Sequence, residues 1–157
     1  MALREIVTIG DDVLRKRARE VVKFDEKLAR LLDDMSETMK LGGQGIGIAA
    51  PQVGVLRRVF IVDIGDEHGL IEFINPEIIS SEGKVLSTEG CLSVPDRSGV
   101  VERPEKIAVR AQDRNGKAFE LEADQLLAVC ICHEHDHLEG ILFVDKLVDV
   151  PDEDAEI

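Results

Sequence analysis

The pentapeptide HEHDH, residues 133–137, directly follows an almost wholly apolar stretch, LLAVCIC at residues 126–132. On an α-helix, residues four apart are neighbours with Cβ atoms about 5–6 Å apart, so the imidazoles of His133 and His137 can reach one point. Glu134 lies about 100° further round the helix, where its carboxylate can reach a metal-bound water without binding the metal. The HExxH spacing therefore predicts a metal site on a helix and favours a metal-dependent hydrolase.

Two histidines among acids can also be an ordinary solvated face of a surface helix. The apolar run before His133 argues against this, because a helix that is apolar on all sides is a buried one. Two histidines at one level of a buried helix need a partner, and a metal ion supplies it. We therefore expect residues 123–138 to form a central helix, with Asp124 as its N-cap and Gly140 just past its end.

Composition limits the function classes. The chain has 157 residues, about the length of one domain, and we expect a catalytic domain over residues 1–148 with an acidic, frayed tail over residues 149–157. With 19 basic and 32 acidic residues the net charge is −13, which argues against direct nucleic-acid binding. The apolar runs are too short to span a membrane, and the first residues do not resemble a secretion signal. The odd number of cysteines, three, favours a reducing, cytoplasmic location.

The rest of the chain alternates helical and extended patterns. Residues 25–40 predict an amphipathic helix with Asp25 as N-cap, ended by Gly42-Gly43. Its apolar stripe has helical spacing and consists of Leu28, Leu31, Leu32, Met35 and Met39. Residues 58–64 and 70–74 predict two antiparallel strands. A short strand is expected around residues 84–87, and residues 107–113 and 117–122 flank Arg114-Asn115-Gly116, a hairpin signal.

A glycine-rich segment, QGIGIAAPQ at residues 44–52, precedes the first of these strands. It is not a phosphate-binding loop, because it lacks the Gly-Lys-Ser/Thr ending and no helix follows it. The segment is either a tight connection into the next strand or a place where the backbone approaches a ligand closely. In the second case Gln52, a neutral hydrogen-bond donor at its end, takes part in the site.

The third metal ligand does not follow from the HExxH spacing. The metzincin extension would need a third histidine where Phe143 stands. Upstream, Asp63, Asp66 and His68 are options with no spacing in their favour. Cys91 is the best remaining candidate, in a loop-like stretch after a glycine, and it would complete a Cys-His-His site with an open position for water. A lone cysteine is otherwise most often a small buried hydrophobe.

Three stretches together resemble a known family. They are GIGIAAPQ at residues 45–52, EGCLS at residues 89–93 and HEHDH at residues 133–137, and their order and separations resemble those of the peptide deformylases. The resemblance covers residues 6–147. It implies an α+β fold with antiparallel β-sheets packed around a central metal-binding HExxH helix and an N-terminal amphipathic helix. It also implies removal of the N-formyl group from newly made polypeptides that begin with formyl-methionine, with release of formate.

The same resemblance implies roles for individual residues. Cys91, His133 and His137 would bind the metal, Glu134 would move the proton, and the Leu92 backbone N–H and the Gln52 amide would stabilise the oxyanion. The substrate would contact Gly45, Ile46, Gly47, Leu126, Val129 and Cys130, although plain core packing is an equal alternative for Leu126. The resemblance points to Fe(II), while Zn(II), Ni(II) or Co(II) would fit the same ligands.

The implied partners are formylated nascent polypeptides, with at most a transient contact with the ribosome, because the chain lacks the basic C-terminal helical extension of some relatives. Two residues depart from the family pattern. Cys132 stands where glutamine is usual, and His135 stands where an apolar residue is usual. Two alternatives stay open on the residues alone: a metallopeptidase that cuts unformylated peptides, and a structural metal-binding module in which Cys132 closes the fourth position.

Overall fold

Two antiparallel sheets and two α-helices make up the fold in the computed structural model, which describes residues 2–41 and 46–149. The expected helix end at Gly42-Gly43, the predicted contact residue Gly45 and residues 150–157 of the expected tail lie outside the described residues. In chain order the elements are η1 (Asp12–Arg15), α1 (Glu26–Leu41), β1 (Gly47–Ala49), η2 (Ala50–Val53), β2 (Val59–Val62), β3 (Ile71–Glu82), β4 (Val85–Cys91), β5 (Val94–Arg103), β6 (Lys106–Gln112), β7 (Ala118–Asp124), α2 (Gln125–Leu138) and η3 (Phe143–Asp145).

The larger sheet has the strand order β1-β2-β3-β6-β7, and the smaller sheet is the β4–β5 pair. Every neighbouring pair in both sheets is antiparallel, which confirms the α+β class with antiparallel sheets. The expected pairing of the strands near residues 58–64 and 70–74 is that of β2 with β3. The expected hairpin is β6–β7, closed by a hydrogen bond from the Gly116 N–H to the Asp113 carbonyl (2.9 Å) with Gly116 at a φ of +85°.

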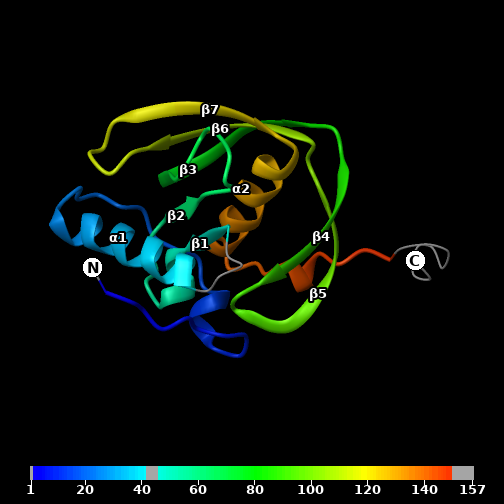
Figure 1. The fold of residues 1–157 in the computed structure, drawn as a ribbon, viewed down its shortest axis with the longest axis horizontal. Helices are drawn as coiled ribbons and strands as arrows, with labels where there is room; N and C mark the ends of the chain where they lie inside the picture. Colours follow the sequence, from blue (N-terminus) through cyan, green and yellow to red (C-terminus); the bar gives the residue numbers. More distant parts are fainter. Residues whose placement is uncertain (1, 42–45, 150–157) are drawn as a thin grey trace.

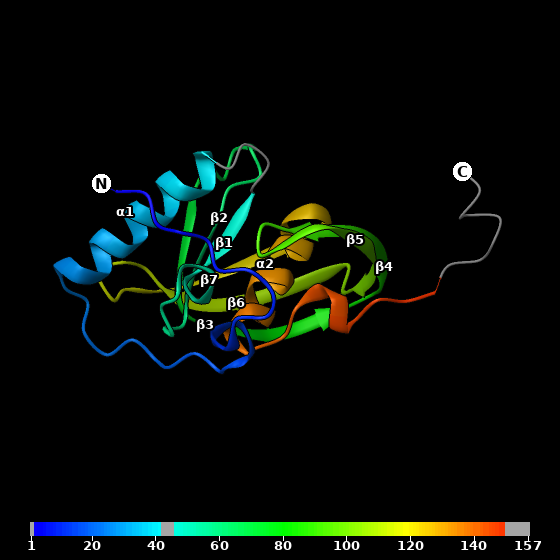
Figure 2. The ribbon, with the colours of Figure 1, turned by 90° about the horizontal axis from the view of Figure 1, so that it is seen from below.

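Strand β2 is apolar along its whole length because both of its faces are covered. Phe60 and Val62 pack in the same cluster as α2, whereas Val59 and Ile61 pack in the cluster that contains α1. Side chains alternate between the faces of a strand, so an unbroken apolar run is what a strand between two helices requires. The sheet therefore holds α1 on one face and α2 on the other (Figures 1 and 2).

Helix α2 lies in the middle of the molecule, with β3, β6 and β7 around one end and the β4–β5 pair beside the other (Figure 1). Asp124, the last residue of β7, occupies the N-cap position, but its side chain makes no capping hydrogen bond. Beyond the helix, Gly140 has a φ of +76°, and a Cβ there would lie 2.6 Å from the Arg15 carbonyl oxygen. Only glycine fits this turn, which packs the helix end against η1.

Helix α1 covers the outer face of β1 and β2. Its buried stripe follows the helical spacing of the sequence and includes Leu28, Leu31, Leu32, Met35 and Met39. Asp25 caps the helix, since its Oδ1 accepts a hydrogen bond from the Leu28 N–H (3.1 Å). Neither α1 nor α2 has the length and apolar character that crossing a bilayer requires, and this holds for every helix among the described residues.

Candidate metal centre and its cleft

The last two turns of α2 present His133 and His137 on one face. Their ring centroids are 5.3 Å apart, as the i, i+4 spacing predicts. Cys91 ends β4 and brings its Sγ to 3.4 Å from Nε2 of His137. Cys91, His133 and His137 each offer one ligand atom, and these atoms lie within 4.8 Å of one another. The expectation that Cys91 lies in a loop is wrong: it is a strand residue, placed beside a bulge between Gly90 and Cys91.

The other sequence candidates for the third ligand do not join this group. Asp66, Glu67 and His68 form a separate, largely exposed cluster in the turn between β2 and β3, where the Asp66 carboxylate contacts His68 Nδ1 at 2.8 Å. Cys132 packs in the α2 core cluster, and burial raises the pKa of its thiol to about 11. Among the described residues, the donors within reach of His133 and His137 thus come from Cys91, and Cys132 does not close the fourth position.

The chemistry of the donor set fits a cation. Nε2 of His137 faces Cys91 Sγ, and Oε1 of Glu134, the residue next to His133, is buried without a hydrogen-bond partner among the described residues. Burial lowers the pKa of His137 to about 3, so its imidazole is neutral at pH 7. Burial also lowers the pKa of His133, but hydrogen bonds to Cys91 and Glu89 outweigh this and raise it to about 10. The proton held on His133 by these neighbours is the charge that a bound cation would replace.

A buried ion-pair network holds His133 in place. Nδ1 of His133 lies 2.9 Å from Oε1 of Glu89. Arg103 donates two hydrogen bonds to the Glu89 carboxylate, at 2.8 and 2.7 Å, and a third to Asp136 at 2.7 Å. Burial raises the pKa of Glu89, but the hydrogen bonds from Arg103 and His133 outweigh it and lower this pKa to about 2. Glu89 therefore stays ionised and orients the ring so that Nε2 is left for a ligand.

Gln52 lies beside Cys91 with its amide fixed at both ends. Its Oε1 accepts a hydrogen bond from the Ala49 N–H (2.9 Å), and its Nε2 donates to Ser93 Oγ (3.1 Å) and lies 3.5 Å from Cys91 Sγ. The short helix η2 produces this arrangement by turning the chain directly after β1. The described part of residues 44–52 therefore forms a tight connection from β1 through η2, and the close approach of its backbone to a ligand stays a prediction.

Glu134 lies at the junction of α2 and β1. Burial raises the pKa of its carboxyl to about 7, although the neighbouring His133 lowers it. A carboxyl that titrates near neutral pH is suited to take up and release a proton. The absence of a side chain at Gly47 leaves room for the Glu134 carboxylate, because a Cβ at residue 47 would lie 2.7 Å from Glu134 Oε2.

A cleft of about 570 Å³ opens onto the group. Ten predicted site residues from three parts of the chain line it, whereas His137 is buried behind them: Ile46, Gly47 and Gln52; Cys91 and Leu92; and Leu126, Val129, Cys130, His133 and Glu134. Leu126 is 51% exposed, so the core-packing alternative for it is wrong.

The sequence did not indicate Glu89, Ser93 and Arg103 as members of the site, since their contacts depend on strand register. Glu89 and Ser93 flank the Gly-Cys-Leu stretch, whereas no sequence signal marks Arg103.

The comparison with known proteins agrees with this geometry. Residues 3–152 match the sequence model of the family described as Polypeptide deformylase. The chain belongs to the peptide deformylase family. A peptide deformylase from Caldicellulosiruptor bescii is 57% identical over 148 residues, covering 94% of this chain and 87% of the relative. Another from Clostridium botulinum is 54% identical over 146 residues, covering 93% and 97%.

Solved structures of peptide deformylases have the same fold. The enzyme from Legionella pneumophila superposes with a TM-score of 0.88 at 48% identity, over 93% of this chain and 86% of that one. The enzyme from Thermotoga maritima gives 0.89 at 40% identity, over 94% and 99%. Peptide deformylases are metallohydrolases that remove the N-formyl group from nascent polypeptides and use a divalent metal. The resemblance seen in the three sequence stretches is confirmed, and the metallopeptidase and the non-enzymatic module are not supported.

Proposed function

We propose that Cys91, His133 and His137 of this peptide deformylase hold one divalent metal ion, Fe(II) in the cell. The buried cluster of three donor atoms within 4.8 Å carries this proposal. One thiolate and two imidazoles suit Fe(II) and Zn(II), and Ni(II) or Co(II) fit the same set. In this proposal α2 is the central metal-binding helix, and α1 is the amphipathic helix that supports β1 from behind.

Glu134 is the proposed proton carrier. A metal ion held by the three ligands would lower the pKa of a water and polarise the formyl carbonyl. Glu134 takes the proton of the attacking water and passes it to the leaving amine as the formyl C–N bond breaks. Its pKa of about 7 and its position one residue from His133 support this role.

Gln52 and Leu92 are the proposed oxyanion donors. The Nε2 group of Gln52 points toward Cys91, and Leu92 follows Cys91 in the chain and lines the cleft. Donors of this kind stabilise the tetrahedral oxygen when they are fixed before the reaction. The two hydrogen bonds that Gln52 makes to Ala49 and Ser93 supply that fixation.

The methionine side chain of the substrate would enter the cleft between β1 and the first turns of α2. The proposed contacts in the described chain are Ile46, Gly47, Leu126, Val129 and Cys130; Gly45 completes the set from outside it. Strand β1 pairs only with β2 among the described strands, which leaves its other edge for the substrate backbone. A peptide added there as a further strand would point its first side chain at the helix.

Domain organisation and location complete the proposal. Residues 1–148 would form one catalytic domain, followed by an acidic tail over residues 149–157, most of which lies outside the described residues. The three free cysteines support a cytoplasmic location, where formylated nascent chains are found. Any contact with the ribosome would be transient and brought about by the nascent chain itself.

The decisive assay is formate release from formyl-Met-Ala-Ser by protein purified without oxygen and loaded with Fe(II), with Met-Ala-Ser as the unformylated control. We expect formate from the first peptide only, and its loss on chelation. The Glu134→Gln variant should keep the metal and lose about 10²–10⁴-fold in turnover. Cleavage of Met-Ala-Ser would indicate a peptidase, and full activity of Glu134→Gln would remove Glu134 from its role. Parallel loading with Zn(II), Ni(II) and Co(II) tests the preference for Fe(II), which fails if another ion gives faster turnover.

A further inference from the structure

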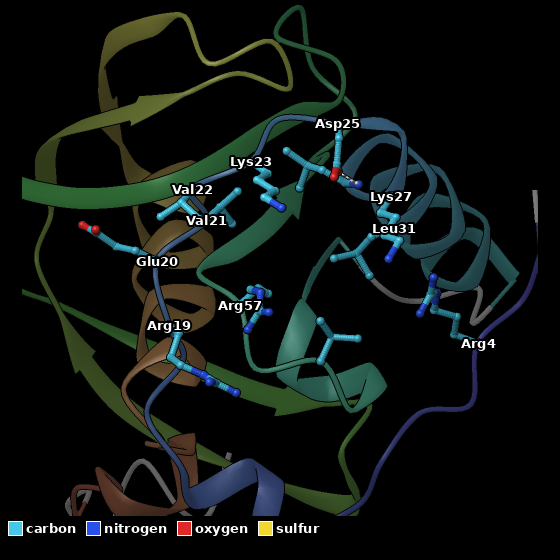
Figure 3. Close-up of a pocket in the computed structure, with 12 residues that line it drawn as sticks. Arg4, Arg19, Glu20, Val21, Val22, Lys23, Asp25, Lys27, Leu31 and Arg57 are labelled. Atoms are coloured by element: carbon cyan, nitrogen blue, oxygen red, sulfur yellow. Dashed lines mark hydrogen bonds between the residues drawn. The ribbon is translucent and has the colours of Figure 1, made fainter.

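A second pocket, of about 630 Å³, lies between the first turns of α1 and the extended segment 19–25 (Figure 3). Its walls are the extended segment 19–25, the first turns of α1 and the connection from η2 into β2. It shares no lining residue with the metal-centre cleft. We call it the basic pocket, because its lining includes Arg4, Arg19, Lys23, Lys27 and Arg57.

Four of these five cations have no ionic partner within the described residues, whereas Arg4 pairs with Asp34. Although acids outnumber bases by 32 to 19, Arg19, Lys23, Lys27 and Arg57 form no ion pair within the described residues. Five basic side chains against two acids, Glu20 and Asp25, leave the lining with an excess of positive charge. Glu20 points away from the basic side chains in Figure 3, and the Asp25 carboxylate accepts from the Leu28 N–H that it caps. The pocket is thus a concentration of positive charge in an acidic protein.

Backbone pairing holds two of the arginines side by side. Arg19 and Arg57 form a parallel β-bridge, in which the Arg19 N–H donates to the Leu56 carbonyl (3.1 Å) and the Arg58 N–H donates to the Arg19 carbonyl (2.8 Å). Like charges placed opposite each other on neighbouring strands destabilise the pairing. Figure 3 shows both side chains on the same side of the backbone, directed toward the pocket. An anion between them would relieve this repulsion.

Arg4, on the opposite wall of the pocket, is also held in a fixed position. Arg4 is held by the buried Asp34, whose Oδ2 accepts from Nε and contacts Nη2, both at 3.0 Å. Between Arg4 and the Arg19–Arg57 pair the floor is apolar, formed by Leu28 and Leu31 of α1 with Val21 and Val55. An inorganic ion would contact the cations alone and leave this floor in water. A ligand with a charged head and an apolar body would use both.

We propose that the basic pocket binds a small amphipathic anion, with a carboxylate or phosphate group on an apolar chain. The size of the ligand follows from electrostatics. At physiological ionic strength charges are screened over about 8 Å, so a small anion responds to the local cations, whereas an extended polyanion such as RNA also meets the surrounding negative surface. The volume of the pocket is within the range of small-molecule sites.

The test titrates metal-loaded protein with octyl phosphate and octanoate, monitored by calorimetry and by chemical-shift changes. Inorganic phosphate and 1-octanol are the controls for the head group and the apolar chain. We expect the two anionic amphiphiles to bind more tightly than either control, and the tighter of the two identifies the head group. Equal binding of 1-octanol would overturn the role of the cations, and equal binding of inorganic phosphate would overturn that of the floor. Absence of binding at millimolar concentration would overturn the site.

Variants in which a lining charge is reversed test whether the probe binds in the basic pocket. Arg57→Glu and Lys23→Glu should each weaken binding by about tenfold or more. Lys117→Glu is the matched control, because Lys117 is exposed in the β6–β7 turn and carries the same change of charge. Binding that survives both reversals would place the probe elsewhere, including at the metal centre, and would overturn the proposal. Thermal unfolding verifies the fold of each variant, and Arg57→Gln replaces the reversal if Arg57→Glu does not fold.

Discussion

Gly47 and Glu134 are in contact across the junction of β1 and α2, with the carboxylate of Glu134 filling the space that a side chain at residue 47 would take. A Cβ on Gly47 would lie 2.7 Å from Oε2, 3.0 Å from Cγ and 3.1 Å from Cδ of Glu134. The strand edge proposed to receive the substrate and the proposed proton carrier are therefore packed against each other. A substitution at either residue is therefore expected to displace the other.

Gly47→Ala tests this contact. The added methyl group would displace the Glu134 carboxylate, and a displacement of about 1 Å in a catalytic group can cost about 10²-fold in turnover. We expect a fall in kcat with metal content and thermal stability close to wild type. Gly90→Ala is the matched control, because its Cβ would meet only an ordinary contact, 3.6 Å from the Arg97 carbonyl oxygen. A Gly47→Ala enzyme with normal kcat and only a raised KM would show that Glu134 adjusts freely.

Gln52→Leu should lower kcat by about 10²–10³-fold, as expected for the loss of one oxyanion donor. The substitution also leaves the buried Ala49 N–H without its acceptor, which should cost about 1–3 kcal/mol of stability. Steady-state kinetics and urea unfolding separate the two effects. If kcat is unchanged while stability falls, Gln52 has only the structural role of ordering η2.

Glu89→Gln should weaken metal binding by about 10–100-fold, because the neutral amide no longer holds the His133 ring through a charged hydrogen bond. Competition against a chelator of known affinity measures this change directly. Glu120→Gln serves as the control, since it removes an exposed carboxylate whose partner is Arg110. Identical metal affinity in both variants would mean that the packing of α2 alone orients His133.

Asp34→Asn should produce a stability loss that depends on pH. The pKa of Asp34 lies below its usual value of 3.8, mainly because the Ala2 backbone N–H donates to the carboxylate, with Arg4 adding to the effect. A carboxyl with a lowered folded-state pKa contributes stability above its unfolded pKa, and this contribution is lost as the pH falls through the folded pKa. Urea unfolding should therefore show a larger gap between wild type and variant at pH 7 than near pH 3. A gap that does not change with pH would mean that the charge of Asp34 is not involved.

Local patterns predicted the elements that are specified by neighbouring residues. The stripe of α1, the β6–β7 hairpin and the end of α2 at Gly140 follow from spacing and turn chemistry within a few residues. The candidate metal cluster joins such a pattern, His133 with His137, to Cys91, which is indicated by the exclusion of other ligands and by the family resemblance.

Contacts that depend on strand register could not be predicted from local sequence patterns. Arg103 reaches Glu89 only because β4 and β5 pair so that Val85 faces Arg103 and Gly90 faces Ser98. The contact of Gly47 with Glu134 joins residues that are far apart in the sequence, and no periodicity connects them. The basic pocket, likewise, forms from three separate segments whose charges are unremarkable one at a time.

The position of α2 in the chain also determines the order of assembly. The seven strands in the described part of the chain all precede this helix, yet the inner face of the larger sheet packs on it through residues such as Phe60 and Phe73. While the chain is being synthesised from its N-terminus, that face has no partner until residue 138 has emerged. Folding of this protein during translation must therefore finish late, and shortened chains that lack α2 would expose an apolar sheet to chaperones and to aggregation.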